Sequence, residues 1–274
     1  MTVMHFELGG RRLQADLADP LSVAIPLDFG GPQPAAFGAP PAAARVLRAP
    51  GFVGDTRQGG SCNCEELTVT PHGNGTHTEC VGHLTDERVS VSEVLRGGLC
   101  LALLVSVRPV PAAATRESTD PAPEADDLLI TAAALREAAG AHASLAPRAL
   151  VVRTLPNGVE RLSRSYYGPA PAPYLTREAA AWLVERGIEH LVLDVPSADR
   201  ASDDGRLTAH RAFFGLPSGS RRANEARRPR ASITELAYVA PTIRDGWYLL
   251  DLQVPPFLTD AAPSRPILFP VRFE

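Results

Sequence analysis

The sequence contains no lysine, because all 27 basic residues among its 274 are arginine. Chemistry that depends on a lysine nucleophile, such as a Schiff base with a carbonyl compound, is therefore excluded. Cysteine is scarce as well: four residues are too few for a scaffold held by disulfide bonds, and they favour an intracellular protein with free thiols. A net charge of −4 gives no excess of positive charge with which to bind nucleic acid.

Long apolar runs are also missing. None approaches the ~20 residues that a membrane-spanning helix needs, and the longest, over 98–107, predicts a buried strand instead. The first residues show no basic segment followed by an apolar one, so no secretory signal is expected. A hydrophobic fraction of 45% is typical of a globular protein. We therefore expect a cytoplasmic protein without a membrane partner.

Three common enzyme signatures are absent too. No Gly-x-Ser-x-Gly elbow occurs, which argues against an α/β-hydrolase. The glycine-rich stretches match the spacing of neither a dinucleotide-binding loop nor a P-loop. The chemistry must therefore be carried by other residues.

The chain is predicted to form a single α/β domain over 1–274. Residues 1–60 are rich in proline and glycine and predict an extended N-terminal arm. Two segments, 109–127 and 218–230, have the composition of exposed loops. Helical and strand patterns alternate over 131–195, which is typical of helices packed on a sheet.

Thr131 and Thr176 are the expected N-caps of two helices, 131–139 and 176–187, the second ending at Gly187. A shorter helical turn is expected at 91–95. The expected strands are 67–70, 99–107, 149–153, 191–193, 233–239, 248–254 and 265–272.

Three of the seven histidines fall within twelve residues, at His72, His77 and His83, and Glu79 lies among them. Neutral imidazole together with carboxylate suits zinc, manganese or iron. His77 and Glu79 are two residues apart, so in an extended segment they point to the same side. Gly73 tolerates the backbone angles needed to fold His72 back toward them. The run therefore predicts a metal site, with a histidine-rich surface loop as the alternative.

The nearby cysteines predict no second site. Cys62 and Cys64 are not spaced as a zinc knuckle, and no further pair completes a structural zinc site. Cys64 and Cys80 are expected to be small buried residues that line the pocket. A cysteine nucleophile with a histidine partner is the remaining alternative.

The run His72–His83 resembles the signature of the cyclase family of metal-dependent hydrolases, which includes bacterial kynurenine formamidase and isatin hydrolase. That signature is His-x-Gly-Thr-His-x-Asp-x-Pro-x-His. Gly75-Thr76-His77 and His83 match it, whereas Glu79 stands in place of Asp and Val81 in place of Pro. The first histidine is offset by one residue, since Gly73 occupies its position, and a one-residue bulge is the expected way for His72 to take its role.

Further matches follow in the family's order, so that the resemblance extends over 20–272. Residues 193–199, Leu-Asp-Val-Pro-Ser-Ala-Asp, resemble the family's Asp-Thr-Pro-Ser-x-Asp strand end. His210 and Glu235 resemble a later histidine and a later glutamate. Residues 260–265 resemble Asp-Gly-x-Pro-x-Arg.

The resemblance implies a swivelling β/β/α fold and a homodimer. His72, His77 and Glu79 would hold one divalent ion, zinc or alternatively manganese. A second ion would be held by Glu79, His210 and Glu235, with Glu79 bridging. Because glutamate has one methylene more than aspartate, a site with one metal ion is the alternative.

The activity implied is hydrolysis of a C–N bond in a small amide, formamide or lactam, as in the arylformamidases of tryptophan catabolism. A divalent ion lowers the pKa of bound water from ~15.7 to about 7 and so supplies a nucleophile at neutral pH. His83 would act as general acid and base. Two alternatives are a cyclase or dehydratase acting on a polyketide-like substrate, and a non-catalytic metal-binding protein.

Overall fold

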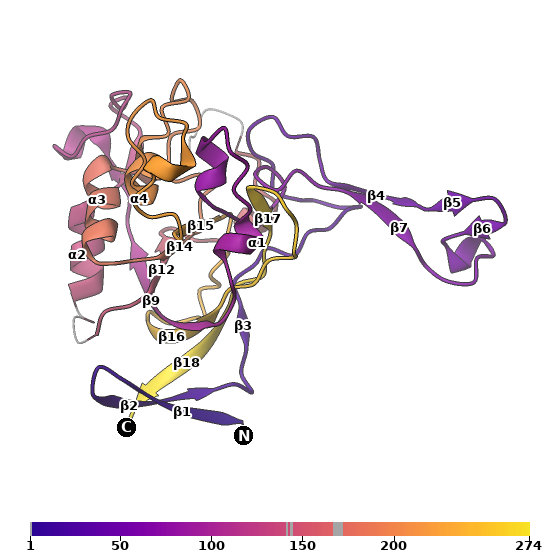
Figure 1. The fold of residues 1–274 in the computed structure, drawn as a ribbon, viewed down its shortest axis with the longest axis horizontal. Coiled ribbons are helices and arrows are strands. Elements are labelled where there is room, and N and C mark those ends of the chain that lie inside the picture. The colour runs from indigo at the N-terminus through magenta and orange to yellow at the C-terminus, as the bar shows by residue number, and fades with distance from the viewer. Residues whose placement is uncertain (1, 141, 143–144, 167–171) are drawn as a thin grey trace.

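The computed structural model describes residues 2–140, 142, 145–166 and 172–274. Eleven strands of these residues form one twisted sheet (Figure 1). In spatial order the strands are β1 (Val3–Leu8), β2 (Arg11–Asp16), β18 (Ile267–Phe273), β16 (Gly246–Asp251), β9 (Leu99–Val107), β12 (Ala149–Thr154), β14 (His190–Leu193), β15 (Ser232–Glu235), β8 (His77–Glu79) and β17 (Ala261–Pro263), with β3 (Leu21–Ser22) beside β18.

The centre of the sheet is parallel, since β9, β12, β14 and β15 run in the same direction. Strands β9, β12 and β14 are almost continuously apolar and are buried on both faces, as parallel strands with covered faces usually are. The strands on either side, β16 and β8, are antiparallel to their neighbours. The carboxyl end of β15 therefore meets the beginning of β8.

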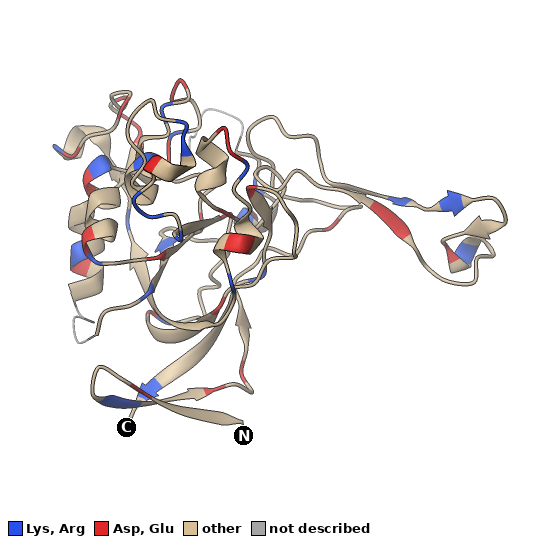
Figure 2. Ribbon diagram, in the orientation of Figure 1, with Lys and Arg blue, Asp and Glu red and all other residues tan. Residues whose placement is uncertain are grey.

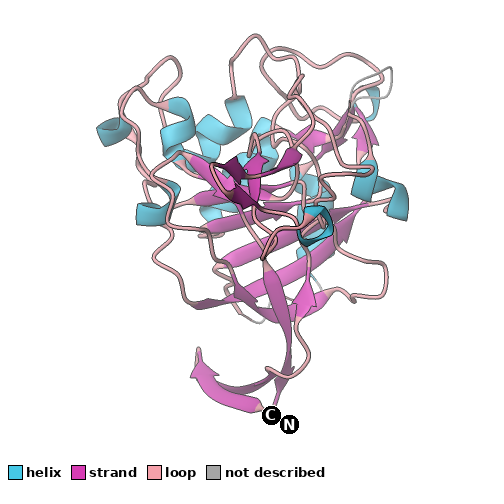
Figure 3. Cartoon of the chain, turned by 90° about the vertical axis from the view of Figure 1, so that its right-hand side faces the viewer, coloured by secondary structure: helices cyan, strands magenta, loops and turns pink. Residues whose placement is uncertain are grey.

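In the described part of the chain the helices are few and short (Figure 3). Three of them, α2 (Ala132–Gly140), α3 (Arg177–Glu185) and α4 (Thr208–Phe214), pack on the same side of the sheet and enclose its larger apolar core. Helix α1 (Val91–Val94) contributes Val91 to the second apolar cluster. Short 3-10 turns complete the set: η1 (Thr56–Gln58), η2 (Val81–Leu84), η3 (Ala112–Ala114), η4 (Val159–Ser163) and η5 (Ala223–Glu225).

A two-stranded ribbon formed by residues 43–68 projects from the body (Figure 1). The word arm refers to these residues below, and not to the whole of the segment 1–60. The stem of the arm pairs β4 (Ala43–Val46) with β7 (Glu65–Thr68), and β5 (Arg48–Ala49) pairs with β6 (Phe52–Val53) toward its tip. A small separate sheet joins β10 (Val110–Pro111), β11 (Leu128–Ile130) and β13 (Tyr174–Leu175). Residues 3–16, in contrast, are part of the main sheet and bury Leu13.

The structure confirms the α/β class and most of the expected elements. Thr176 caps α3, since its side chain accepts a hydrogen bond from Ala179 N, and Thr131 caps α2 in the same way. The strand expected over 233–239 was wrong in length, because Leu236 has a φ of 52° and β15 ends at Glu235. Among the described residues, every helix is too short or too polar to span a bilayer.

Candidate metal centre

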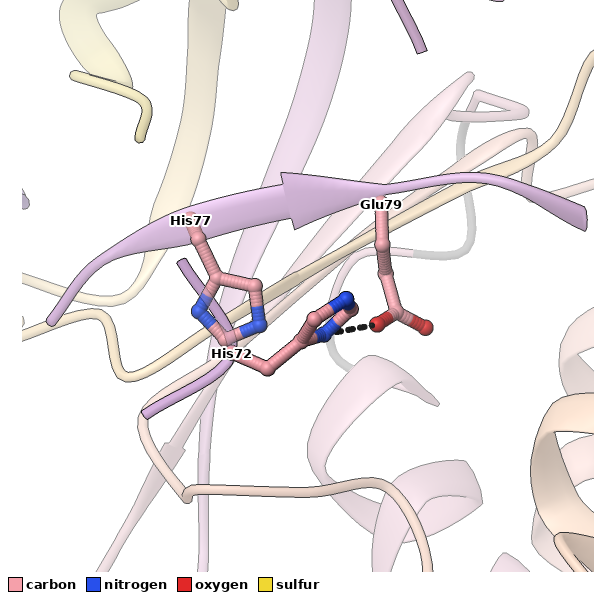
Figure 4. A group of neighbouring side chains, drawn as sticks. All are labelled: His72, His77 and Glu79. Atoms are coloured by element: carbon pink, nitrogen blue, oxygen red, sulfur yellow. Dashed lines mark ion pairs between the residues drawn. The ribbon is translucent and has the colours of Figure 1, made fainter. Parts of the chain in front are cut away.

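Strand β8 places His77 and Glu79 on one buried face, as expected for residues two apart in a strand (Figure 4). The strand lies between β15 and β17 and is antiparallel to both. In this register Glu235 is directly opposite His77, and His77 Nε2 lies 3.6 Å from Glu235 Oε2. The sharp turn at Leu236 makes Glu235 the last residue of β15, at the edge where the site forms.

His72 reaches the same face from the turn that precedes β8 (Figure 4). Its Nδ1 atom lies 3.1 Å from Glu79 Oε2, and its ring centroid is 5.1 Å from that of His77. Asn74 stabilises the turn, because its side-chain oxygen accepts a hydrogen bond from Thr70 N and its amide donates to Pro40 O. The offset histidine is thus brought beside His77 and Glu79.

Gly73 explains why the histidine is offset. A Cβ atom at this position would lie 2.2 Å from Ala39 Cβ, so no larger residue fits without movement of the N-terminal segment. The position that carries a histidine in the family signature is therefore filled by glycine here. His72, one residue earlier, supplies the imidazole instead.

His210 enters from helix α4 and is held by Asp199. The Asp199 carboxylate accepts hydrogen bonds from Ala209 N and His210 N and lies 2.7 Å from His210 Nδ1. The other ring nitrogen, Nε2, therefore points at the cluster, 2.9 Å from Glu79 Oε1 and 3.3 Å from Glu235 Oε1. A carboxylate on the outer nitrogen is the usual partner of a metal-binding histidine.

His83 and Asp260 complete the group. His83 lies on η2, with its Nε2 atom 4.0 Å from Glu79 Oε2 and its Nδ1 atom 3.2 Å from Asp260 Oδ2. Asp260 immediately precedes β17, and the same oxygen is 2.9 Å from His72 Nε2. Sequence reasoning included Asp260 in a family match but gave it no role, and its only signal was its place just before a strand.

These contacts shift the pKa values of several residues in the cluster. Burial opposes a charge on His72, but Asp260 and Glu79 outweigh it and raise the pKa of His72 to about 10. Burial likewise opposes a charge on His210, yet the carboxylates around it raise its pKa well above the usual value. Burial alone would raise the pKa of Glu79, whereas His83 and His210 hold it well below its usual range. The site is therefore built for positive charge, which protons or a cation can supply.

Four buried atoms of the cluster have no hydrogen-bond partner among the residues that the structure describes: His77 Nε2, His210 Nε2 and both carboxylate oxygens of Glu79. Although His210 Nε2 is close to Glu79 Oε1, the two do not meet in hydrogen-bond geometry. Leaving such atoms unpaired costs about 1–3 kcal/mol each. A divalent ion would satisfy all four, because imidazole nitrogen and carboxylate oxygen are its normal ligands.

The ligand atoms fall into three overlapping groups in which all atoms lie within 4.8 Å of one another. These groups are His72–His77–Glu79, Glu79–His210–Glu235 and His72–His83–Asp260. The first two are the sets that the sequence predicted for two ions, and Glu79 belongs to both. The structure thus brings all six predicted site residues together and adds Asp260.

The other residues singled out in the sequence lie elsewhere. Asp194 is buried directly after β14, where it accepts hydrogen bonds from Thr154 and pairs with Arg161 at 3.0 Å. Cys80 is buried, which raises the pKa of its thiol to about 12 and rules it out as a thiolate nucleophile at neutral pH. Cys64 does not line the pocket as expected, because it lies in the arm and packs against Gly54.

Two cavities meet at His83, whose side chain is 27% exposed. One, of about 420 Å³, is also lined by Asp260 and Leu258. The other, of about 220 Å³, is also lined by Arg211 and Arg221. His83 therefore separates the buried cluster from the space that a small molecule can enter.

The fold and the cluster define a mixed α/β protein with a candidate metal centre at one edge of its sheet. The model of the family described as "Putative cyclase" matches residues 15–200, which is more than half of the chain, and the protein belongs to this family. The match contains His72, His77, Glu79 and His83. The remaining members of the cluster follow it in the sequence.

Solved structures share this fold over nearly the whole chain. Isatin hydrolase A from Labrenzia aggregata is 16% identical with a TM-score of 0.61, covering 92% of this chain and 93% of that chain. A "predicted metal-dependent hydrolase" from Bacillus stearothermophilus is 15% identical with a TM-score of 0.56, covering 92% and 98%. Isatin hydrolase A from Ralstonia solanacearum is 14% identical with a TM-score of 0.58, covering 92% and 91%. A comparison with curated proteins finds no match.

Proposed function

We propose that the protein is a metal-dependent hydrolase that cleaves a C–N bond in a small amide, formamide or lactam. The observation that carries this proposal is the convergence of unpaired buried atoms from His77, Glu79 and His210 beside the accessible His83. Structural neighbours described as a metal-dependent hydrolase and as isatin hydrolases support it.

The roles of the residues follow from their positions. A divalent ion held by the cluster would supply a nucleophilic hydroxide at neutral pH. The residues that would hold the ion are His72, His77, Glu79, His210 and Glu235, and Asp199 keeps the His210 imidazole oriented. His83 lies at the boundary between cluster and cavity, where it can take a proton from the attacking water and pass it to the departing amine.

Zinc is the metal proposed, with manganese as the alternative, because two or three imidazoles with carboxylates suit both ions. Metal analysis of the purified protein, before and after treatment with chelator, tests this. Turnover is then measured on aryl formamides, isatin-like lactams and lactones. Metal-dependent release of an amine supports the proposal. A protein without affinity for divalent ions would contradict it, and turnover confined to polyketide-like substrates would favour a cyclase or dehydratase.

We also propose that the protein is a cytoplasmic homodimer. All four cysteines are free, as expected in a reducing compartment. The arm exposes 58% of Leu67 and reaches well beyond the body of the molecule (Figure 1). Sedimentation analysis of the full chain and of a variant in which Gly-Gly replaces residues 43–68 tests whether the arm holds two copies together, since only the full chain should be a dimer.

A further inference from the structure

Arginine surrounds a cavity of about 450 Å³ beside α4, which is lined by the segments before and after that helix and by the first residue of α3. Its four basic lining residues are Arg177, Arg206, Arg211 and Arg221. Among the described lining residues Asp120 is the one acid, and it lies 3.6 Å from the guanidinium of Arg206. In Figure 2 the arginines recur in blue along the loop after α4. The cavity therefore carries a net positive charge in a protein that is acidic as a whole.

This cavity continues into the smaller one at His83. Gly205, Arg211 and Arg221 line both, and His83 lines the second together with Leu207 and one acid, Asp86. An anion held by the two shared arginines would thus lie in the same cavity as the residue proposed to move the proton.

The two shared arginines are suited to bind a ligand. Arg211 is held in place by backbone oxygens alone, since its side chain donates to Arg206 O, Pro217 O and Ser220 O. Within the described part of the chain, no carboxylate comes within 4.0 Å of its guanidinium. Arg221 has Asp86 at 4.0 Å, but both side chains are about three-quarters exposed, and such pairs contribute little.

We propose that the substrate carries a carboxylate, which binds between Arg211 and Arg221 while its scissile C–N bond lies against His83. This inference rests on the proposed hydrolase function and specifies its substrate class. Hydrogen bonds from a guanidinium to a carboxylate are charge-assisted. The Nη2 atom of Arg211, which donates to none of the three backbone oxygens, is left for the ligand. The cavity at His83, about 220 Å³, exceeds the ~150 Å³ in which benzene fits, so a substrate with one aromatic ring is accommodated.

The test compares N-formylanthranilate with formanilide, which is the same aryl formamide without the carboxylate. Arg221→Glu should raise the KM for N-formylanthranilate at least tenfold and change that for formanilide less than twofold. Arg222→Glu is the matched control, because it changes the same charge one residue outside both cavities and should alter neither KM. An Arg221→Glu variant that affects both substrates equally, or neither, overturns the proposal.

A binding measurement separates this inference from the proposed function. Anthranilate fluorescence reports its binding to chelator-treated protein, and Arg221→Glu should raise its dissociation constant at least tenfold relative to wild type and Arg222→Glu. If neither formamide is hydrolysed but this difference is found, the hydrolase function fails and the carboxylate site stands. If anthranilate binds both variants equally, the carboxylate site fails even where hydrolysis is observed.

Discussion

Asp260 Oδ2 lies 2.9 Å from His72 Nε2, on the side of the ring opposite the nitrogen that meets Glu79. This contact orients the histidine that is displaced by one residue from the family signature. Asp260→Asn should keep the fold but lower metal affinity and kcat by about 10–100-fold, the usual effect of losing an orienting carboxylate. Calorimetric metal titration and turnover measure this, with the exposed Asp19→Asn as control. Unchanged metal affinity would show that the contact has no role in orienting His72.

His72→Ala tests whether the displaced histidine is a ligand. If it completes the His72–His77–Glu79 group, the variant should bind one ion fewer per chain than wild type, as should His77→Ala. Metal content after dialysis gives the stoichiometry, and the exposed His5→Ala serves as control. Full occupancy in His72→Ala would assign the first ion to other residues.

His83→Ala should lower kcat by roughly 10²–10⁴-fold, the range for a general acid or base. Its metal content should stay close to that of wild type, because His83 lies outside the two groups predicted to hold metal ions. Steady-state kinetics and metal analysis of one preparation give both values. Turnover that survives intact in this variant would assign the proton transfer to another residue.

His190, at the start of β14, should make the free energy of unfolding depend on pH. Burial and, to a smaller extent, the positive charge of Arg148 lower the pKa of His190 to about 4, whereas in the unfolded chain the value is about 6.5. The unfolded state therefore binds the proton more tightly than the folded state. The contribution of neutral His190 to the free energy of unfolding is complete above pH 6.5 and is lost as the pH falls toward 4.

Urea unfolding of chelator-treated protein at pH 7.5 and pH 5 measures the effect. Wild type should lose about 2 kcal/mol more than His190→Asn between these values, since each pKa unit corresponds to ~1.36 kcal/mol. His5→Asn should behave like wild type, because that histidine is largely exposed. Equal losses in wild type and His190→Asn would mean that His190 does not titrate in this way.

The sequence allowed the local structure to be predicted well. Thr131 and Thr176 marked the starts of α2 and α3 because capping depends on residues only three apart. His77 and Glu79 could be placed on one face because a strand alternates with period two. His210 and Glu235 entered the predicted site only through the family's order of motifs.

Long-range geometry could not be predicted. The contact between Asp260 and His83 joins residues 177 positions apart, and neither composition nor periodicity encodes such a distance. The left-handed conformation of Leu236, which ends β15 and positions Glu235, is unfavourable for a branched side chain and has no local signal. The cavity between Arg211 and Arg221 could not be predicted from the sequence either, because a helix and a loop form it together.

Strand β8 has only three residues and is paired on both edges by strands from the last third of the chain. During synthesis on the ribosome, His77 and Glu79 therefore have no sheet to join until β15 and β17 have emerged. Closing loops of this length costs entropy before the pairing compensates for it, so the docking of β8 should come late in folding. We therefore expect the chain to bind metal only after its last strands have been synthesised and after the parallel core has formed.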